Sequence, residues 1–262
     1  MYISCCAPIR QCQMVAEAGF DRVALSAQEV AGTPPDQLKQ LEGQLASWAL
    51  ECRALNDFCP PELKLCGPNH DPEQLEHYIR QLAPRAALLG VDRIGVGAPL
   101  SRDVPAGYPR TAAWNQLRRS LDLTARLCRP WGITILLEPI CRQMTNLLNR
   151  TPEVLALIEH CEEPVGVVYD IFHAWMMQEP PADALPAMDR VGIVHIAHAQ
   201  DGRRLPDGET VIRYRPYLEM LLDAGYQGEL SVEAQMDGAD RFQLTQSCRA
   251  LRGMVTPRSA AG

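Results

Sequence analysis

The chain has 262 residues, of which 47% are hydrophobic and 22% are charged, and its formal net charge is −7. This composition is typical of a folded globular protein, and the length suits either one large α/β barrel or two smaller domains. The Lys and Arg residues are scattered along an acidic chain. Because binding to a phosphate backbone needs clustered basic residues, we expect no nucleic-acid partner.

No apolar run approaches the roughly 20 residues that cross a membrane, and the first residues, MYISCCAPIR, lack the pattern of a secretory signal. We therefore expect a cytoplasmic protein without a membrane partner. Ten cysteines are dispersed along the chain without a C-x-x-C pair. We expect most of them to be reduced thiols that pack as small apolar residues, with Cys5 and Cys6 on alternate faces of a strand.

Short β-rich runs alternate with longer stretches of helical periodicity along the whole chain. Eight such units, with parallel strands and right-handed crossovers, predict a (β/α)₈ TIM barrel that forms a single domain over residues 1–262. We expect the strands at 2–6, 22–26, 54–58, 93–97, 133–138, 165–170, 192–197 and 229–233.

Several helix and loop signals accompany these strands. Long helices are expected over 36–52 and 111–128, and Asp71 and Thr151 each stand before a proline as capping residues. The proline-containing pieces 32–35, 99–109, 179–186 and 203–209 are interpreted as βα loops, which build the active-site face of a barrel. The tail after Arg252 is expected to be frayed.

Four of the predicted strands end in side chains that can bind a metal ion. A single charged residue after an apolar strand is usually just the first solvated loop position, but four on neighbouring strands point into one barrel mouth. Three carboxylates held close together repel one another unless a cation neutralises them. Oxygen donors with one imidazole favour Mn²⁺, Mg²⁺ or Co²⁺ over a structural zinc site. The four residues are Glu138, Asp170, His195 and Glu233.

Two further histidines follow these residues at close spacing. His173 comes three residues after Asp170, and His198 comes three residues after His195. From spacing alone, each is either a functional contact or an incidental histidine.

The strand-end motifs resemble those of the xylose isomerase-like TIM-barrel superfamily, which includes ketose 3-epimerases, hydroxypyruvate isomerase, inosose dehydratase and endonuclease IV. The resemblance covers nearly the whole chain and is sharpest in LLEPICRQMTN, YDIFH, HIAHAQDGRRLPDGE and GYQGELSVEA. Weaker matches are AEAGFDRVAL, FCPPELKLCGP and LGVDRIGVGAPLSRDVPAGY.

The resemblance implies that the four strand-end residues bind one divalent cation, commonly manganese, and that Glu138 and Glu233 exchange a proton on opposite faces of a sugar. It implies a metal-stabilised enediolate next to a carbonyl, and substrate contacts from His173 and from Arg203 or Arg204. It also implies a small carbohydrate-like substrate and assembly into a homo-oligomer.

Two departures from the epimerase pattern concern the substrate side of the site. Met144 stands six residues after Glu138, where the epimerases carry a second glutamate that binds the sugar. His198 stands where an acidic residue is usual. A thioether is a poor acceptor for a sugar hydroxyl, so one end of the substrate is expected to be less polar.

These observations leave several hypotheses open. The leading hypothesis is a metal-dependent isomerase or epimerase of a small ketose, sugar phosphate or hydroxy-ketone. The alternative is a metal-dependent lyase, such as a dehydratase of the inosose or dehydroshikimate type or an enzyme that cleaves an oxidised glycoside. An abasic-site endonuclease is disfavoured by the acidic chain, and a non-catalytic relative is disfavoured by the complete ligand set. Mn²⁺ is the expected cation, with Mg²⁺, Co²⁺ and Zn²⁺ as alternatives.

Overall fold

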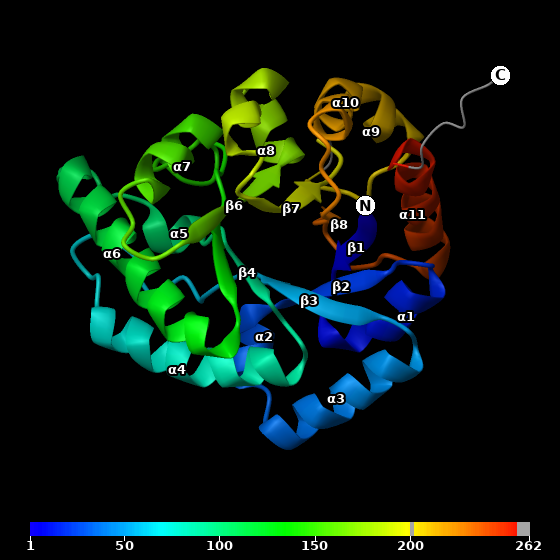
Figure 1. Cartoon of the computed structure of the whole chain (residues 1–262), viewed down its shortest axis with the longest axis horizontal. Coiled ribbons are helices and arrows are strands. Elements are labelled where there is room, and N and C mark those ends of the chain that lie inside the picture. Colours follow the sequence, from blue (N-terminus) through cyan, green and yellow to red (C-terminus); the bar gives the residue numbers. More distant parts are fainter. Residues whose placement is uncertain (200–201, 256–262) are drawn as a thin grey trace.

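The computed structural model describes residues 1–199 and 202–255 and contains a closed barrel of eight parallel strands. Each strand pairs with its neighbour in sequence, and β8 returns to pair with β1, which Figure 1 shows beside the N-terminus. The predicted (β/α)₈ barrel is confirmed. The strands are β1 Tyr2–Cys6, β2 Arg22–Ser26, β3 Glu51–Asn56, β4 Arg93–Val96, β5 Thr134–Leu137, β6 Val165–Asp170, β7 Val191–Ile196 and β8 Glu229–Val232.

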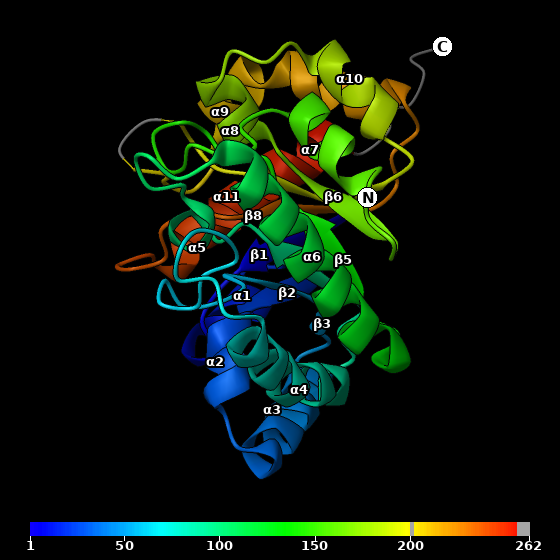
Figure 2. The same cartoon turned by 90° about the vertical axis from the view of Figure 1, so that its left-hand side faces the viewer.

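Helices surround the barrel on all sides, with α3 and α4 at one end of the view in Figure 2 and α10 at the other. Within the described ranges, none combines the length and the apolarity needed to cross a membrane. The helices are η1 Ile9–Gln11, α1 Cys12–Glu17, α2 Ala27–Gly32, α3 Pro35–Ser47, α4 Pro72–Leu88, α5 Pro99–Arg102, α6 Arg110–Cys128, η2 Arg129–Trp131, α7 Thr151–Ile158, α8 Ile171–Met176, η3 Pro181–Ala187, α9 Gly208–Arg213, α10 Arg215–Asp223 and α11 Arg241–Val255.

Apart from the third strand, which is shifted, the strand boundaries agree with the prediction to within one residue. Ala49 adopts a left-handed φ of 52° just after α3, so the helix ends well before residue 52. The chain then pairs with β2 from Glu51 onward, which recruits residues expected to be helical. Asp57, with a φ of 48°, ends β3 two residues earlier than predicted. Tertiary pairing therefore outweighs local helix propensity here.

The two predicted helix caps have different outcomes. Asp71 caps α4 as expected and accepts hydrogen bonds from the backbone N–H groups of Glu73 and Gln74. Thr151 does not cap α7 but is its first residue. Its N–H instead donates to the buried carboxylate of Glu179 over 3.0 Å. Glu179, which is distant in sequence, thus provides the capping acceptor at the start of α7 that we expected from the Thr151 side chain.

Three predicted loops contain or adjoin helical structure. Residues 99–109 include α5, and residues 179–186 overlap η3, which packs between α7 and α10 as part of the outer layer. Residues 32–35 join α2 to α3 and so do not directly follow a strand. Residues 253–255 complete α11, and the rest of the tail that is expected to be frayed, residues 256–262, lies outside the described residues.

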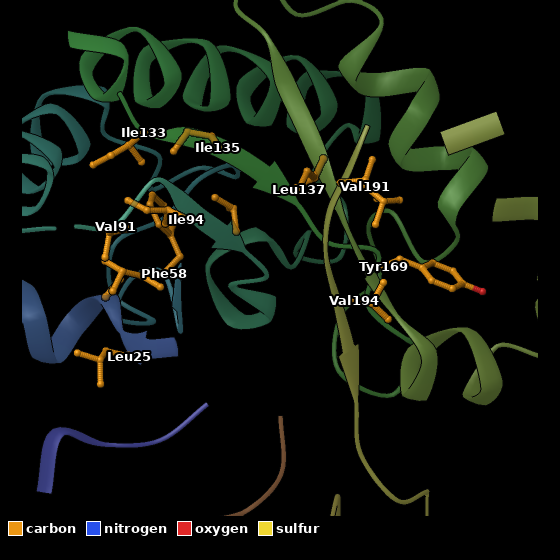
Figure 3. Packing of buried hydrophobic residues seen from close by; sticks show 14 of the residues in the cluster. Leu25, Phe58, Val91, Ile94, Ile133, Ile135, Leu137, Tyr169, Val191 and Val194 are labelled. Carbon is orange, nitrogen blue, oxygen red and sulfur yellow. The ribbon is translucent and has the colours of Figure 1, made fainter. Parts of the chain in front are cut away.

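Two apolar layers pack against opposite faces of the strands. The outward-facing residues, among them Ile94, Ile135 and Tyr169, pack with the helices, and Figure 3 shows the Tyr169 ring pointing away from β6. A small separate cluster fills the barrel interior, so the barrel is a packed core and not a channel. That inner cluster consists of Cys6, Ala24, Ala54, Leu136, Val168 and Ile193.

The cysteines follow the same division. All ten are free thiols and nine are buried. Cys5 packs in the outer layer and Cys6 in the inner one, so the predicted alternation is confirmed.

At the beginning of the strands, the barrel is closed by the buried carboxylate of Glu229, which lies 3.4 Å from Arg22 and 3.5 Å from Arg93. These charges lie at the opposite end of the strands from the candidate site.

Candidate metal centre

The strand alternation explains why four polar side chains converge at the end of the barrel. Side chains two residues apart on a strand share a face. Leu136, Val168 and Ile193 belong to the inner apolar cluster. Two residues further along the same strands are Glu138, Asp170 and His195, and Glu233 follows Ser231 in the same way on β8. The candidate ligands therefore form the next inward-facing layer above the core.

The four predicted ligands lie close together and are mostly buried. Each offers one donor atom, and all four donor atoms lie within 4.8 Å of one another. His195 Nδ1 lies 3.3 Å from Glu138 Oε1 and 3.5 Å from Glu233 Oε2. Three carboxylates and one imidazole at this separation suit a divalent cation with a preference for oxygen donors. The residues present therefore fit the cation that the sequence predicts.

Asp170 has a second role that fixes its carboxylate. It is the N-cap of α8, and its Oδ1 accepts hydrogen bonds from the N–H groups of Phe172 and His173, over 2.7 and 3.2 Å. This leaves Oδ2 directed toward the other polar groups of the site, where it contacts Arg203 over 3.0 Å. One short strand-to-helix turn thus provides both the cap and a rigidly held donor atom.

Arg203 is the cation that the chain itself places among these carboxylates. Its guanidinium group contacts both Asp170 and Glu233, and it lies over the Phe172 ring with 4.9 Å from Cζ to the ring centroid. The residue adopts a φ of 68°, which is uncommon for a residue with a side chain. Such a backbone conformation costs free energy and is often found at functional sites.

The two glutamates have opposite pKa shifts. Burial and then repulsion from Glu233 raise the pKa of Glu138. Burial also disfavours the carboxylate of Glu233, but attraction to Arg203 and to His195 outweighs it and holds the pKa well below its usual range. Burial opposes the charged form of His195, yet Glu233 and Cys6 raise its pKa well above the ordinary value. Neighbouring carboxyl groups with separated pKa values are typical of acid–base pairs.

A pocket of about 280 Å³ opens above the candidate ligands. Glu138, His195 and Glu233 line it, together with His173, Arg203 and Met144. Gly97 leaves space in this wall for Glu138, because a Cβ atom there would lie 2.5 Å from Glu138 Oε2. The pocket also has an apolar side, formed by Pro61, Pro99, Leu100 and Ile140.

The predicted substrate contacts divide into two groups. Arg203, His173 and Met144 line the pocket, and His173 Nε2 lies 3.6 Å from Asp170 Oδ2. His198 and Arg204 are not among the described residues of that lining. His198 is fully buried and its Nε2 lies 3.0 Å from a guanidinium nitrogen of Arg204. Of the two arginines that the sequence left open, Arg203 lines this pocket and Arg204 lines a separate one with Asp207 and Phe242.

Three residues near the site were missed by sequence reasoning. Asn56 donates from Nδ2 to Glu233 Oε1 over 3.2 Å. Arg102 is fully buried and donates to the backbone oxygen of Glu138 over 2.7 Å. Cys6 lies with His195 and Glu233 in a second group of potential metal donors. Asn56 was not found because the third strand was expected to end at residue 58, whereas β3 ends at Asn56.

Comparison with known proteins identifies the family. The sequence profile described as "Xylose isomerase-like TIM barrel" matches residues 12–254. The chain belongs to the xylose isomerase-like TIM-barrel family. The superfamily resemblance predicted from the strand-end motifs is confirmed.

Solved structures show the same barrel. A D-psicose 3-epimerase from Clostridium cellulolyticum H10 superimposes with a TM-score of 0.79 at 18% identity, over 97% of this chain and 98% of that one. The 3-keto-D-glucoside 4-epimerase from E. coli gives a TM-score of 0.73 at 16% identity, over the same shares of the two chains. At these identities the likeness establishes the fold of this family member.

A curated sequence relative is the inosose dehydratase of Klebsiella pneumoniae, which is 25% identical over 149 residues. The match includes 48% of this chain and 49% of the dehydratase, so the chain spans about half the length of the curated relatives it matches.

Proposed function

We propose that this family member is a divalent-metal-dependent isomerase or epimerase that moves a proton next to the carbonyl of a small ketose, sugar phosphate or hydroxy-ketone. The observation that carries the proposal is the convergence of Glu138, Asp170, His195 and Glu233, three of which line a pocket. The neighbouring folds of sugar epimerases support the same reaction class.

The cation would be held by these four residues, with Mn²⁺ preferred and Mg²⁺, Co²⁺ or Zn²⁺ as alternatives. When bound, a divalent cation polarises a carbonyl and a neighbouring hydroxyl, which makes the adjacent C–H bond more acidic. The buried position of Asp170 and its two backbone hydrogen bonds hold one donor in a fixed direction. Rigidly held donors reduce the rearrangement needed on binding.

Glu138 and Glu233 are proposed as the acid–base pair. They directly follow strands β5 and β8, both contact Nδ1 of His195, and both line the pocket. One carboxylate removes the proton from the carbon next to the carbonyl, and the other returns a proton from its own side. Asn56 holds Oε1 of Glu233, which leaves Oε2 toward Arg203 and the substrate space.

The remaining pocket residues would orient the substrate. Arg203 and His173 provide donors for its oxygen atoms, since both side chains line the pocket next to Asp170. Met144 would contact its less polar end. Assembly into a homo-oligomer and a cytoplasmic location stay predictions.

Proton exchange with solvent tests the proposal. Purified protein reconstituted with Mn²⁺ should incorporate deuterium from D₂O at the carbon next to the carbonyl of at least one member of a broad ketose panel. Failure to exchange with any member, in protein shown to contain metal, would rule out the proposed reaction.

A pair of matched variants tests the metal centre itself. Asp170→Asn keeps the capping oxygen of α8 but loses a charged donor, so we expect loss of bound Mn²⁺ measured by elemental analysis. Asp71→Asn makes the same change at the N-cap of α4, away from the pocket, and should leave the metal content unchanged. Equal metal content in both variants would exclude Asp170 as a ligand.

The apolar side of the pocket favours a second candidate function. Met144 is 39% exposed and Leu100 is 58% exposed, and both line the pocket. The same proton abstraction followed by departure of a β hydroxyl or alkoxyl group would make the protein a lyase acting on a partly deoxygenated or aromatic substrate. The inosose dehydratase match supports this alternative. A conjugated product with new ultraviolet absorption would distinguish a lyase from an epimerase, whose product has no new double bond.

A further inference from the structure

We infer that Cys6, His195 and Glu233 form a second metal position, which prefers thiophilic cations such as Zn²⁺ or Cd²⁺ and also accepts Co²⁺. One donor atom from each residue lies within 4.8 Å of the other two. This position shares two of its ligands with the oxygen-rich set described above. The inference is independent of the reaction that the protein catalyses.

Barrel closure brings Cys6 to this place. β1 pairs with β8 with Ser4 opposite Ser231, and two residues further along both strands are Cys6 and Glu233. Cys6 belongs to the inner apolar cluster, and this pairing places it next to the layer that contains Glu233, although 227 positions separate the two residues in sequence. Cys6 Sγ lies 3.4 Å from Ser231 Oγ, which confirms that the thiol faces β8 within the barrel.

The distances suit a small metal ion. In a tetrahedral zinc site with Zn–S near 2.3 Å and Zn–N near 2.1 Å, neighbouring donor atoms are about 3.6 Å apart. Donors now within 4.8 Å reach that separation by small side-chain movements. A thiolate, an imidazole and a carboxylate form a mixed set typical of zinc and other soft or borderline cations.

The other cysteines show that Cys6 differs from an ordinary packing thiol. Nine of the ten cysteines are buried and pack among apolar side chains. Among the described residues, however, Cys6 is the one cysteine that belongs to a group of three or more potential metal donors. A bound cation would displace its proton, as in other thiolate sites.

The two positions compete because they share His195 and Glu233. A hard cation such as Mn²⁺ is favoured by the three carboxylates, and a thiophilic cation is favoured by the set that contains Cys6. The protein is thus expected to bind both kinds of cation, in different coordination. A thiophilic cation at the second position would withdraw two ligands from the oxygen-rich set.

Cobalt spectroscopy tests this inference directly. The full chain, stripped of metal and loaded with one equivalent of Co²⁺, should show a near-ultraviolet thiolate-to-cobalt charge-transfer band. Cys6→Ser should lose the band. Cys5→Ala removes the neighbouring thiol, which faces the outer layer, and should retain it. Absence of the band in the wild-type protein would overturn the inference, as would its persistence in Cys6→Ser.

Affinity measurements provide a second readout. Cys6→Ser should weaken Cd²⁺ binding by at least about tenfold and leave the Mn²⁺ dissociation constant unchanged. Cys6→Ala should behave in the same way if the serine variant is poorly folded. An equal loss of affinity for Cd²⁺ and Mn²⁺, or no loss of affinity for either cation, would contradict a separate thiophilic position.

Asp170→Asn separates the two metal positions. Asp170 is absent from the group that contains Cys6. This variant should therefore lose Mn²⁺ but retain the cobalt–thiolate band. Mn²⁺ binding thus reports on the proposed reaction, and the cobalt–thiolate band reports on the second metal position, so the two proposals can fail separately.

Discussion

Gly97 lies directly against the carboxylate of Glu138: a Cβ atom at residue 97 would come within 2.5 Å of Glu138 Oε2 and 3.1 Å of Ile140 Cδ1. Contacts below about 3.0 Å are not tolerated, so any larger residue must move the glutamate. Gly97, just after β4, therefore limits where Glu138, just after β5, can place its carboxylate.

Gly97→Ala is expected to weaken Mn²⁺ binding by about 10- to 100-fold, as for residues that orient metal ligands. Calorimetric titration of metal-free protein measures this directly. The control is Gly43→Ala, on the exposed side of α3, where no atom lies within 4 Å of the added methyl group. The control should raise the free energy of unfolding by about 0.5–1 kcal/mol because alanine is the better helix former. Unchanged metal affinity in Gly97→Ala would contradict a role of Gly97 in positioning Glu138.

Arg203→Gln is expected to strengthen Mn²⁺ binding while weakening substrate binding. The guanidinium group contacts Asp170 and Glu233, so its positive charge competes with a cation for the same carboxylates. Loss of that charge should lower the metal dissociation constant. The KM for substrate should rise, because a donor for the substrate oxygens is lost. A weaker metal affinity in this variant would show that Arg203 supports the centre and does not compete with it.

Met144→Glu tests whether a polar or an apolar part of the substrate faces the loop that follows β5. If the substrate is a polyhydroxylated ketose, the new acceptor should lower KM by about 5- to 10-fold, equivalent to one added hydrogen bond of about 1 kcal/mol. Met144→Leu keeps the apolar surface and should change KM little. For a partly deoxygenated substrate, Met144→Glu should instead raise KM, because the glutamate then lacks a hydrogen-bond partner and must be desolvated.

Asp207 provides a pH-dependent contribution to stability. Burial raises its pKa, but hydrogen bonds from Thr210 outweigh burial, so the pKa in the folded protein lies below the ordinary value of 3.8. The ionised form is therefore the stabilising one, and its contribution is present above the unfolded pKa and lost as pH falls through the folded pKa. Asp207→Ala should cost about 0.5–2 kcal/mol near neutral pH, as for other N-caps.

Urea unfolding at several pH values tests this cap. The difference in free energy of unfolding between wild type and Asp207→Ala should shrink as the pH falls below 3.8. Asp207→Asn keeps a neutral acceptor and should show a smaller loss at neutral pH. A difference that is independent of pH would mean that the charge of Asp207 does not contribute.

The sequence by itself determined the barrel and the inward direction of its polar strand ends. Both follow from local rules, because side chains alternate along a strand and eight alternating strand and helix units close in one way. Asp170, for example, is placed by its own strand, VVYD, and by the helix that it caps. The same rule did not identify Asn56, because the third strand was expected to end at residue 58 and β3 ends at Asn56.

Only the tertiary structure decided the relationships between residues distant in sequence. Spacing could not distinguish Arg203 from Arg204, because the direction of each side chain depends on a left-handed backbone at Arg203. The capping of α7 by Glu179 and the start of β3 depend in the same way on packing and strand pairing. The approach of Cys6 to Glu233 depends on barrel closure, which joins the first strand to the last. These contacts form only after the chain has folded, so no local pattern records them.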